Sequence, residues 1–294
     1  KDNKTIEDKI EQINAASAFW KQSKSSLKDE EYNAFYTSIA NDYQEPMFHI
    51  HTQAEGALDY TTLFYIPKVA PHDMYQPDYA PGVKLYVKRV FITDDEKELM
   101  PTYLRFLRGV IDTEDLPLNV SREILQQNKI LSKIRKNSVK KVLAEFKQLS
   151  KDTEKYNVFY EQYGRPIKEG LYQDHENRET LLELVRFKSS KHEGMISLAE
   201  YADRMSGDQK NIYYLTGGNE STLKNSPLLE MYNNKGIEVL ILDDDIDEII
   251  ISAVPKYKDF NLKSVTHSDA AEDIKDDSDK EAEKSVKPLI KKIK

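Results

Sequence analysis

Arg122 is the residue whose type and position are best suited to chemistry on a phosphate group. It belongs to the segment 112–123, in which Pro117 biases the preceding residue away from helical angles and favours an irregular loop. An arginine keeps its charge at any accessible pH, and its planar fork of donors matches phosphate oxygens. Alternatively, Arg122 braces the loop through carbonyl groups and the neighbouring acids Asp115 and Glu123, because most loop arginines are structural or solvated. The spacing by itself leaves both roles open.

Two predicted helices and a strand position this loop. The run 83–92 is rich in Val, Tyr, Phe and Ile, and it favours a strand. Thr93 and Glu96 then form a capping box, which predicts the start of a helix. That helix is expected to bury an apolar stripe made of Leu99, Tyr103, Phe106, Leu107 and Val110. After the loop, a second helix is predicted over 131–149.

The second helix and its start carry many cations, namely Lys129, Lys133, Arg135, Lys136, Lys140 and Lys141. A basic helix raises the question of nucleic-acid binding. The cations are expected to spread around the helix instead of forming one stripe, and no aromatic residues interleave with them for base stacking. A solvated helix face is therefore the favoured interpretation.

The residues before the strand predict a first lobe of layered helix and sheet. A helix is expected over 27–40, a hairpin of two strands over 47–66 with its turn at Gly56, and a surface loop over 67–81. Trp20, the only tryptophan, follows a polar segment. It is expected to anchor the chain at the edge of this lobe and not to stack on a ligand.

The C-terminal half predicts a second lobe. Segment 151–187 has helical periodicity interrupted by Gly164, Pro166 and Gly170, which indicates a helical connector. A capping box then begins at Ser197. The next elements are expected to be a strand at 210–215, a helix at 221–233, a strand at 237–242, a helix at 246–253 and a short strand at 262–265. This βαβ alternation predicts parallel strands that are covered on both faces.

Three further groups of residues are candidate ligand sites, and a structural role is favoured for each. His49 and His51 project from one face of a strand, but no further metal ligand has convincing spacing. The glycine turn 215–219 lacks the third glycine and the lysine of a phosphate-binding loop. The acids within 243–248 follow a strand where a divalent metal could bind, although an acidic helix start explains them equally well.

Composition excludes several classes of protein. A chain of 294 residues can bury a core without covalent cross-links. Its net charge of −8 argues against nucleic-acid binding, and no apolar run approaches the roughly 20 residues of a membrane span. The absence of cysteine excludes disulfides and thiolate metal sites, and it fits a reducing compartment. We interpret the chain as a fragment of a longer protein.

Four motifs resemble the middle segment of the heat shock protein 90 chaperone family. They are LPLNVSREILQQNKI at 116–130, EEYNAFYTSIANDY at 30–43, KLYVKRVFITDD at 84–95 and QKNIYYLTG at 209–217. The resemblance extends over about residues 18–262 and is nearest to the bacterial branch of the family. It implies an α/β fold with a larger N-terminal and a smaller C-terminal α/β/α lobe, joined by the helical connector.

The resemblance also implies functional residues. Arg122 matches the catalytic-loop arginine that contacts the terminal phosphate of ATP, and Gln126 matches the second residue of that loop. Tyr43 and Phe91 match a patch that docks the nucleotide-binding domain, although ordinary core positions explain them as well. ATP and Mg²⁺ are expected in an N-terminal domain outside this sequence, and no metal site is expected here. Bacterial relatives often carry tryptophan where this chain has Ile249, which weakens a client-binding role there.

The domain organisation follows from the same resemblance. We expect a linker at 1–17, the large lobe with the catalytic loop at 18–150, the connector at 151–187, the small lobe at 188–265, and at 266–294 a linker and the start of a C-terminal dimerisation domain. The expected partners are the two flanking domains and unfolded or partly folded client proteins, without nucleic acid or membrane. The full-length protein is expected to be a homodimeric, cytoplasmic stress-response chaperone, and the fragment a monomer without ATP hydrolysis.

Two other functions stay open. A free-standing α/β enzyme would use its own small-molecule site near Gly217 or Asp243 and would bind nucleotide or metal by itself. An interaction scaffold would use Arg122 for structure only. Replacing Arg122 would then lower stability and spare turnover.

Overall fold

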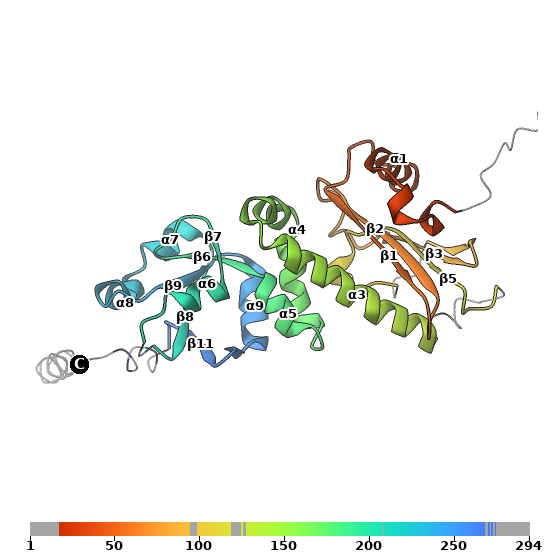
Figure 1. The fold of residues 1–294 in the computed structure, drawn as a ribbon. Helices are drawn as coiled ribbons and strands as arrows, with labels where there is room; N and C mark the ends of the chain where they lie inside the picture. The colour runs from red at the N-terminus through yellow and green to blue at the C-terminus, as the bar shows by residue number, and fades with distance from the viewer. Residues whose placement is uncertain are drawn as a thin grey trace, which may run out of the picture. The chain divides into compact units, whose positions relative to one another are not determined.

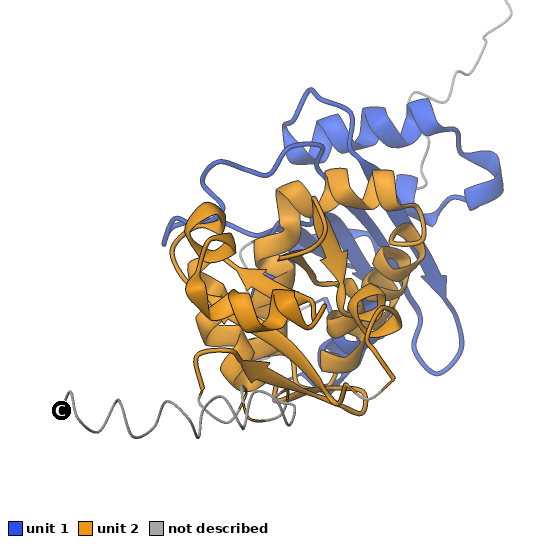
Figure 2. Cartoon of the chain, turned by 90° about the vertical axis from the view of Figure 1, so that its left-hand side faces the viewer, with its two compact units in different colours: residues 1–139 blue, residues 140–294 orange. Residues whose placement is uncertain are grey.

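The computed structural model describes residues 18–94, 99–118, 125, 128–207, 209–267, 270, 272 and 274. The chain divides into two compact units, one ending at Val139 and the other beginning at Lys140 (Figure 2). Each unit holds one β-sheet together with helices (Figure 1), and this confirms the predicted α/β class. Among the described helices, none is both long enough and apolar enough to cross a membrane.

Within its described residues, the first unit forms five strands and the helices that accompany them. The elements are η1 (Phe19–Lys21), η2 (Lys24–Ser26), α1 (Asp29–Ala40), β1 (Phe48–Ala54), β2 (Tyr60–Ile66), β3 (Gly82–Val87), β4 (Val90–Thr93), η3 (Thr102–Leu104) and β5 (Arg108–Thr113). Helix α3 (Lys129–Leu149) follows and continues across the boundary between the units.

The sheet of the first unit has the strand order β1-β2-β5-β3-β4. Strands β1 and β2 form the predicted antiparallel hairpin, and β5 lies between β2 and β3, antiparallel to β2 and parallel to β3. Helix α1 lies against one face of this sheet (Figure 1). Tyr32 and Tyr36 of α1 pack there with Leu63, Tyr65 and Val110 of the sheet, so this face forms a largely aromatic core.

The predicted strand 83–92 is two strands joined by a tight turn. Lys88 and Arg89 occupy the turn between β3 and β4 with φ angles of 50° and 69°. Positive φ at both central residues matches the right-handed twist of a two-residue hairpin. The turn therefore places β4 at the edge of the sheet, with Val90 and Phe91 half exposed.

The prediction of a helix over 93–110 is wrong, because this part of the chain forms η3 and then β5. Glu96, the second residue of the capping box predicted for that helix, lies outside the described residues. Pro101 disfavours helical angles in the residue before it. Gly109 has a φ of 138°, and a Cβ there would lie 2.0 Å from the carbonyl oxygen of Leu63. Since β5 is almost entirely buried, its sequence lacks the polar alternation that distinguishes a strand from a helix.

Helix α3 confirms the helix predicted after the loop, and its cations are dispersed only in part. Of the six predicted cations, Lys129, Lys133, Lys136 and Lys140 share one face at 3.6 residues per turn. Arg135 and Lys141 lie off that face. The interpretation of a solvated face is confirmed, and the prediction that the cations spread around the helix is wrong for the four that share a face.

The second unit alternates strands and helices. Its elements are α4 (Thr153–Gln173), α5 (Arg178–Leu184), β6 (Arg186–Ser189), β7 (Met195–Ser197), α6 (Leu198–Asp203), β8 (Asn211–Thr216), α7 (Glu220–Lys224), η4 (Pro227–Leu229), α8 (Glu230–Asn234), β9 (Val239–Leu242), α9 (Asp245–Ala253), β10 (Lys256–Tyr257) and β11 (Phe260–Ser264). The sheet order is β10-β11-β8-β9-β6-β7. The parallel pairing of β8 with β9 and β11 confirms the predicted βαβ pattern.

Helix α4 differs from the prediction because it is continuous through three expected interruptions. Gly164, Pro166 and Gly170 all lie inside it and all are buried. A Cβ at Gly164 would lie 2.7 Å from the ring of Tyr160, so glycine is needed for close packing there. Burial of α4 against α5 and α9 outweighs the local preferences of glycine and proline.

Candidate functional site

The two predicted catalytic-loop residues, Arg122 and Gln126, lie outside the described residues. The structure does describe the chain up to Leu118, the single position Leu125, and the chain again from Asn128. The site is therefore defined by what fixes the chain on either side of these two residues.

Three consecutive residues, beginning with the last residue of β5, bind the turn between β1 and β2. The Thr113 hydroxyl and the Glu114 amide both donate to the carbonyl oxygen of Asp59, at 3.1 and 3.0 Å. The Asp59 amide donates to Oδ2 of Asp115 at 2.7 Å. The loop thus begins from a point fixed by three hydrogen bonds. If Arg122 only braces the loop, Asp115 is one of its expected partners. One oxygen of the Asp115 carboxylate already accepts the hydrogen bond from Asp59.

A buried carboxylate ties the same point to two other segments. Asp112, at the end of β5, is fully buried and accepts a hydrogen bond from the indole nitrogen of Trp20 at 2.8 Å. Its other oxygen accepts from the backbone amide of Arg89 at 3.2 Å. Glu114 adds ion pairs with Lys21 at 3.1 Å and Arg89 at 3.8 Å. The predicted anchoring role of Trp20 is confirmed. Sequence reasoning missed the role of Asp112, because it assigned this residue to the loop 112–123 and not to a strand.

The C-terminal side of the loop is also fixed. Leu125 is 5 % exposed, so its side chain is part of the core. Asn128 precedes α3, and its Oδ1 accepts hydrogen bonds from the amides of Ile130 and Leu131 at 2.8 and 3.2 Å. This is the arrangement of a helix N-cap. Arg122 therefore belongs to a short segment whose two sides are held by buried or hydrogen-bonded residues.

The two predicted docking residues are on the surface and not in the core. Tyr43 is 87 % exposed and Phe91 is 50 % exposed. The backbone at Tyr43 is fixed by Asp42, which accepts from the Tyr36 hydroxyl at 2.6 Å and from a following amide. The ring of Phe91 packs edge-on against Tyr86, with centroids 5.7 Å apart. Exposed aromatic side chains on a fixed backbone are suited to contact with another protein surface.

His49 and His51 both contact Tyr32 of α1. This agrees with the prediction that the two histidines project from the same face of their strand. The Nε2 atom of His51 lies 2.8 Å from the carbonyl oxygen of Trp20, so Nε2 carries the proton and donates. The Tyr32 hydroxyl then donates to Nδ1 at 2.8 Å. The ring of His49 stacks on that of Tyr32 at 3.8 Å. Because both nitrogens of His51 are engaged, this pair is structural.

We expect the first unit to lose stability as the pH falls below about 6.5, the usual pKa of histidine. Burial lowers the pKa of both His51 and His49 in the folded state. The unfolded chain therefore binds protons at these histidines more readily than the folded chain does. The folded state is fully stabilised above about pH 6.5, and this stabilisation is lost as the pH falls through the lowered pKa values of the folded state. Urea unfolding at about pH 7.5 and about pH 5.5, followed by the fluorescence of the buried Trp20, measures this loss.

Two substitutions control this experiment. His51→Gln should reduce the difference between the two pH values, whereas His72→Gln, at an exposed histidine, should leave it unchanged. An unfolding midpoint of the parent protein that does not depend on pH in this range would contradict the expectation.

Comparison with known proteins places this arrangement in a family. The sequence profile described as Hsp90 protein matches residues 1–294. The chain belongs to the Hsp90 family. The resemblance predicted from the motifs is thereby confirmed.

Individual Hsp90 relatives agree with this assignment. The chain is 58 % identical to the chaperone protein HtpG of Aliarcobacter butzleri and 57 % identical to that of Treponema denticola. These matches cover 100 % and 97 % of this chain but 47 % and 46 % of the relatives, so the chain spans about half their length. It also resembles the solved middle domain of a heat shock protein of Plasmodium falciparum, with a TM-score of 0.76 and 34 % identity over 85 % of this chain and 99 % of that one.

The acidic segment of this Hsp90-family chain is a helix start in which cations pair with the acids. Asp244 caps α9 through its side chain, in a capping box with Asp247. Lys168 of α4 lies 2.7 Å from Asp247, and Lys188 lies 2.6 Å from Asp243. Burial raises the pKa of Asp247, and the Lys168 ammonium opposes that rise. Within the described residues, no group of His, Asp and Glu side chains has the geometry to hold a metal ion.

The glycine turn before α7 likewise has a structural role. The Asn219 side chain accepts a hydrogen bond from the amide of Thr222 at 2.8 Å and caps this short helix. The amide of Gly217 donates to the carbonyl oxygen of Leu242 at 3.1 Å. Because side-chain and backbone oxygens already engage these donors, the turn offers few amides to a phosphate.

Proposed function

We propose that this chain is the middle domain of an ATP-dependent chaperone and that it supplies Arg122 to the terminal phosphate of ATP. The observation that carries the proposal is the fixation of the chain on both sides of Arg122. Hydrogen bonds hold Glu114 and Asp115 on one side, and the core position of Leu125 and the cap at Asn128 hold the other. A short, anchored segment limits the positions that the arginine can adopt, which is what delivery of a charge to another domain requires.

The chemical role of Arg122 is electrostatic. Negative charge spreads over the oxygens of the transferring phosphoryl group, and an arginine from another domain stabilises that charge. Gln126 supports the loop or contributes a further contact to the phosphate. ATP and Mg²⁺ are held by an N-terminal domain of the full-length protein, an inference that rests on the family of this chain.

Docking of that N-terminal domain uses the exposed aromatic surface of the first unit. Tyr43 and Phe91 have large exposed side chains whose backbones are fixed. Apolar residues of this size on a surface are typical of contacts with a partner protein. The same middle domain contributes to the binding of unfolded or partly folded clients. In the full-length protein a C-terminal domain forms the homodimer, and the protein acts in the cytoplasm during stress.

We expect the isolated chain to hydrolyse essentially no ATP, because the nucleotide and metal ligands lie in another domain. Phosphate release should match the buffer blank, whereas the protein extended to the full length of its relatives should turn over ATP under the same conditions. The extended protein is the positive control for the assay. Robust ATP turnover by the isolated chain would contradict the proposal and favour a free-standing enzyme.

A further inference from the structure

Asp112 connects two parts of the first unit, the hairpin of β3 and β4 that carries Phe91 and the start of the loop that carries Arg122. It is the next-to-last residue of β5 and is fully buried. Burying a carboxylate is costly unless hydrogen bonds compensate for its lost hydration. The groups that supply these hydrogen bonds therefore indicate what this residue holds together.

One connection is made directly by the turn between β3 and β4. The backbone amide of Arg89 donates to Oδ1 of Asp112 at 3.2 Å. Next to it, the amide of Lys88 donates to the carbonyl oxygen of Thr113 at 3.0 Å. Phe91 follows this turn and is 50 % exposed. The hairpin that presents Phe91 is thus attached to the last two residues of β5.

A second connection between the same hairpin and Asp112 consists of aromatic rings. Phe91 packs against Tyr86, and the ring of Tyr86 lies against that of Trp20 with centroids 4.5 Å apart. The indole nitrogen of Trp20 donates to Oδ2 of Asp112 at 2.8 Å. Both oxygens of one buried carboxylate are therefore joined to the hairpin, one directly and the other through two rings.

The chain after Asp112 has little freedom before the loop begins. Thr113, Glu114 and Asp115 are each hydrogen-bonded to Asp59, as described above. A packed and hydrogen-bonded interior transmits a displacement from one segment to the next. A shift of the hairpin relative to the end of β5 would therefore displace the first residues of the loop as well.

We propose that Asp112 is a positioning residue, which sets the start of the Arg122 loop relative to the surface that docks the nucleotide-binding domain. This inference rests on the proposed function, because it requires that Arg122 reaches the terminal phosphate of ATP. A misplacement of about 1 Å can lower a catalytic rate on the order of 10²-fold. Because one carboxylate holds both the hairpin and the end of β5, a domain docked on Phe91 also lies at a defined distance from the start of the loop.

The test is ATP turnover by the full-length protein with the substitution Asp112→Asn. An asparagine side chain has one acceptor oxygen, so it can accept from Trp20 or from Arg89 but not from both. We expect kcat to fall about tenfold or more, because the loop is no longer held in one place. The affinity for ATP should be unchanged, since ATP binds to another domain.

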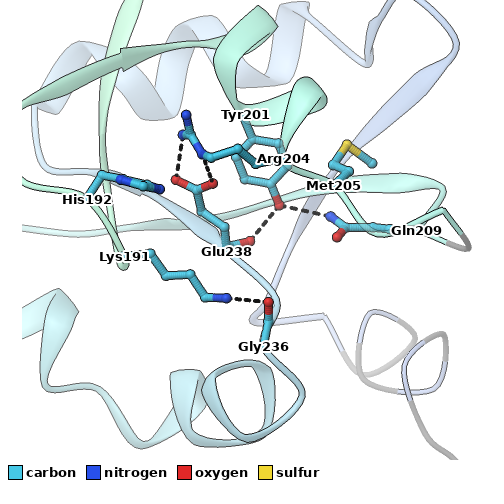
Figure 3. A pocket seen from close by; sticks show the side chains of 8 residues that line it. All are labelled: Lys191, His192, Tyr201, Arg204, Met205, Gln209, Gly236 and Glu238. Carbon is cyan, nitrogen blue, oxygen red and sulfur yellow. Dashed lines mark hydrogen bonds and ion pairs between the residues drawn. The ribbon is translucent and has the colours of Figure 1, made fainter.

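Glu238→Gln is the matched control for a loss of stability alone. Glu238 is a buried carboxylate of the second unit, and Figure 3 shows both of its oxygens in contact with Arg204. It also accepts from Ser189, whose hydroxyl oxygen holds the loop between β6 and β7 through two amides. Its replacement by an amide should lower the melting temperature but leave kcat unchanged.

Trp20→Phe is a milder variant that tests the same contact if Asp112→Asn does not fold. It removes the indole N–H group that donates to Asp112 and keeps an aromatic ring in the core. The Arg89 amide can still donate to the carboxylate. We expect a smaller fall in kcat than for Asp112→Asn, again without a change in the affinity for ATP.

A double variant shows whether Asp112 acts through Arg122. Once Arg122→Ala is present, Asp112→Asn should lower kcat little further, because the side chain that it misplaces is already absent. The inference is overturned if Asp112→Asn, or Trp20→Phe in its place, spares kcat while Arg122→Ala lowers it. It is also overturned if Asp112→Asn has an equal effect with and without Arg122, or if Glu238→Gln lowers kcat by the same factor. Turnover that survives Arg122→Ala would contradict the proposed function itself, and this inference with it.

Discussion

Replacing Arg122 by alanine in the full-length protein should lower ATP turnover on the order of 10²-fold or more. The substitution removes one positive charge from the oxygens of the phosphoryl group in the transition state. Because that charge develops during transfer, the affinity for ATP should change little. Steady-state turnover, nucleotide affinity and the melting temperature, measured on the same preparations, separate the two effects.

Arg135→Ala is a suitable control for Arg122→Ala. Arg135 lies on α3 and outside the loop, so its loss removes the same charge and should spare turnover. Turnover that survives Arg122→Ala, together with a lower melting temperature, would show that the loop arginine is structural. The chain would then act as an interaction scaffold, and the proposed catalytic role would be wrong.

Replacing Lys168 by methionine should destabilise the second unit by about 3–5 kcal/mol, because it leaves Asp247 as an unpaired buried charge. The side chains of Lys168 and Asp247 are 7 % and 1 % exposed, and their charged atoms lie 2.7 Å apart. Methionine preserves most of the apolar length of the lysine, although it also removes the ammonium that lies 5.1 Å from the ring centroid of Phe187. Urea unfolding followed by circular dichroism measures the loss.

Two further variants show whether the buried pair is responsible. Lys141→Met breaks an exposed pair with Glu145 on α3 and should cost about 0.3–0.5 kcal/mol. Adding Asp247→Asn to Lys168→Met removes the buried charge while keeping a capping side chain, so part of the lost stability should return. A cost for Lys168→Met no larger than that of Lys141→Met would contradict this account of the pair.

Much of the fold could be predicted because its signals are local. The hairpin of β1 and β2 follows from two apolar runs and a glycine turn, and the parallel strands β8, β9 and β11 follow from their alternation with helices. The capping box of Ser197 and Glu200 forms as expected, with the Glu200 amide donating to the serine hydroxyl at 3.1 Å. Hydrogen bonds from Ser197 lower the pKa of Glu200, although burial acts in the opposite direction.

The errors in the fold occur where burial outweighs local preference. Strand β5 is enclosed on both faces, so its apolar residues carry no alternation and were compatible with a helix. Helix α4 continues through Gly164 and Pro166 because it is buried against α5 and α9. In both cases the neighbouring elements set the conformation. These elements are distant in the sequence, so the residues of the segment alone do not reveal them.

For the candidate site, the sequence by itself determined the family, the loop motif and the chemistry available to Arg122. Only the tertiary structure decided which groups hold that loop and the second unit in place. Trp20 and Asp112 are 92 residues apart, and Ser189 and Glu238 are 49 apart, yet each pair is hydrogen-bonded in the interior. A buried polar group must find a partner to offset its lost hydration, and folding brings that partner from a distant part of the chain. Residue types and spacing do not encode such partners locally.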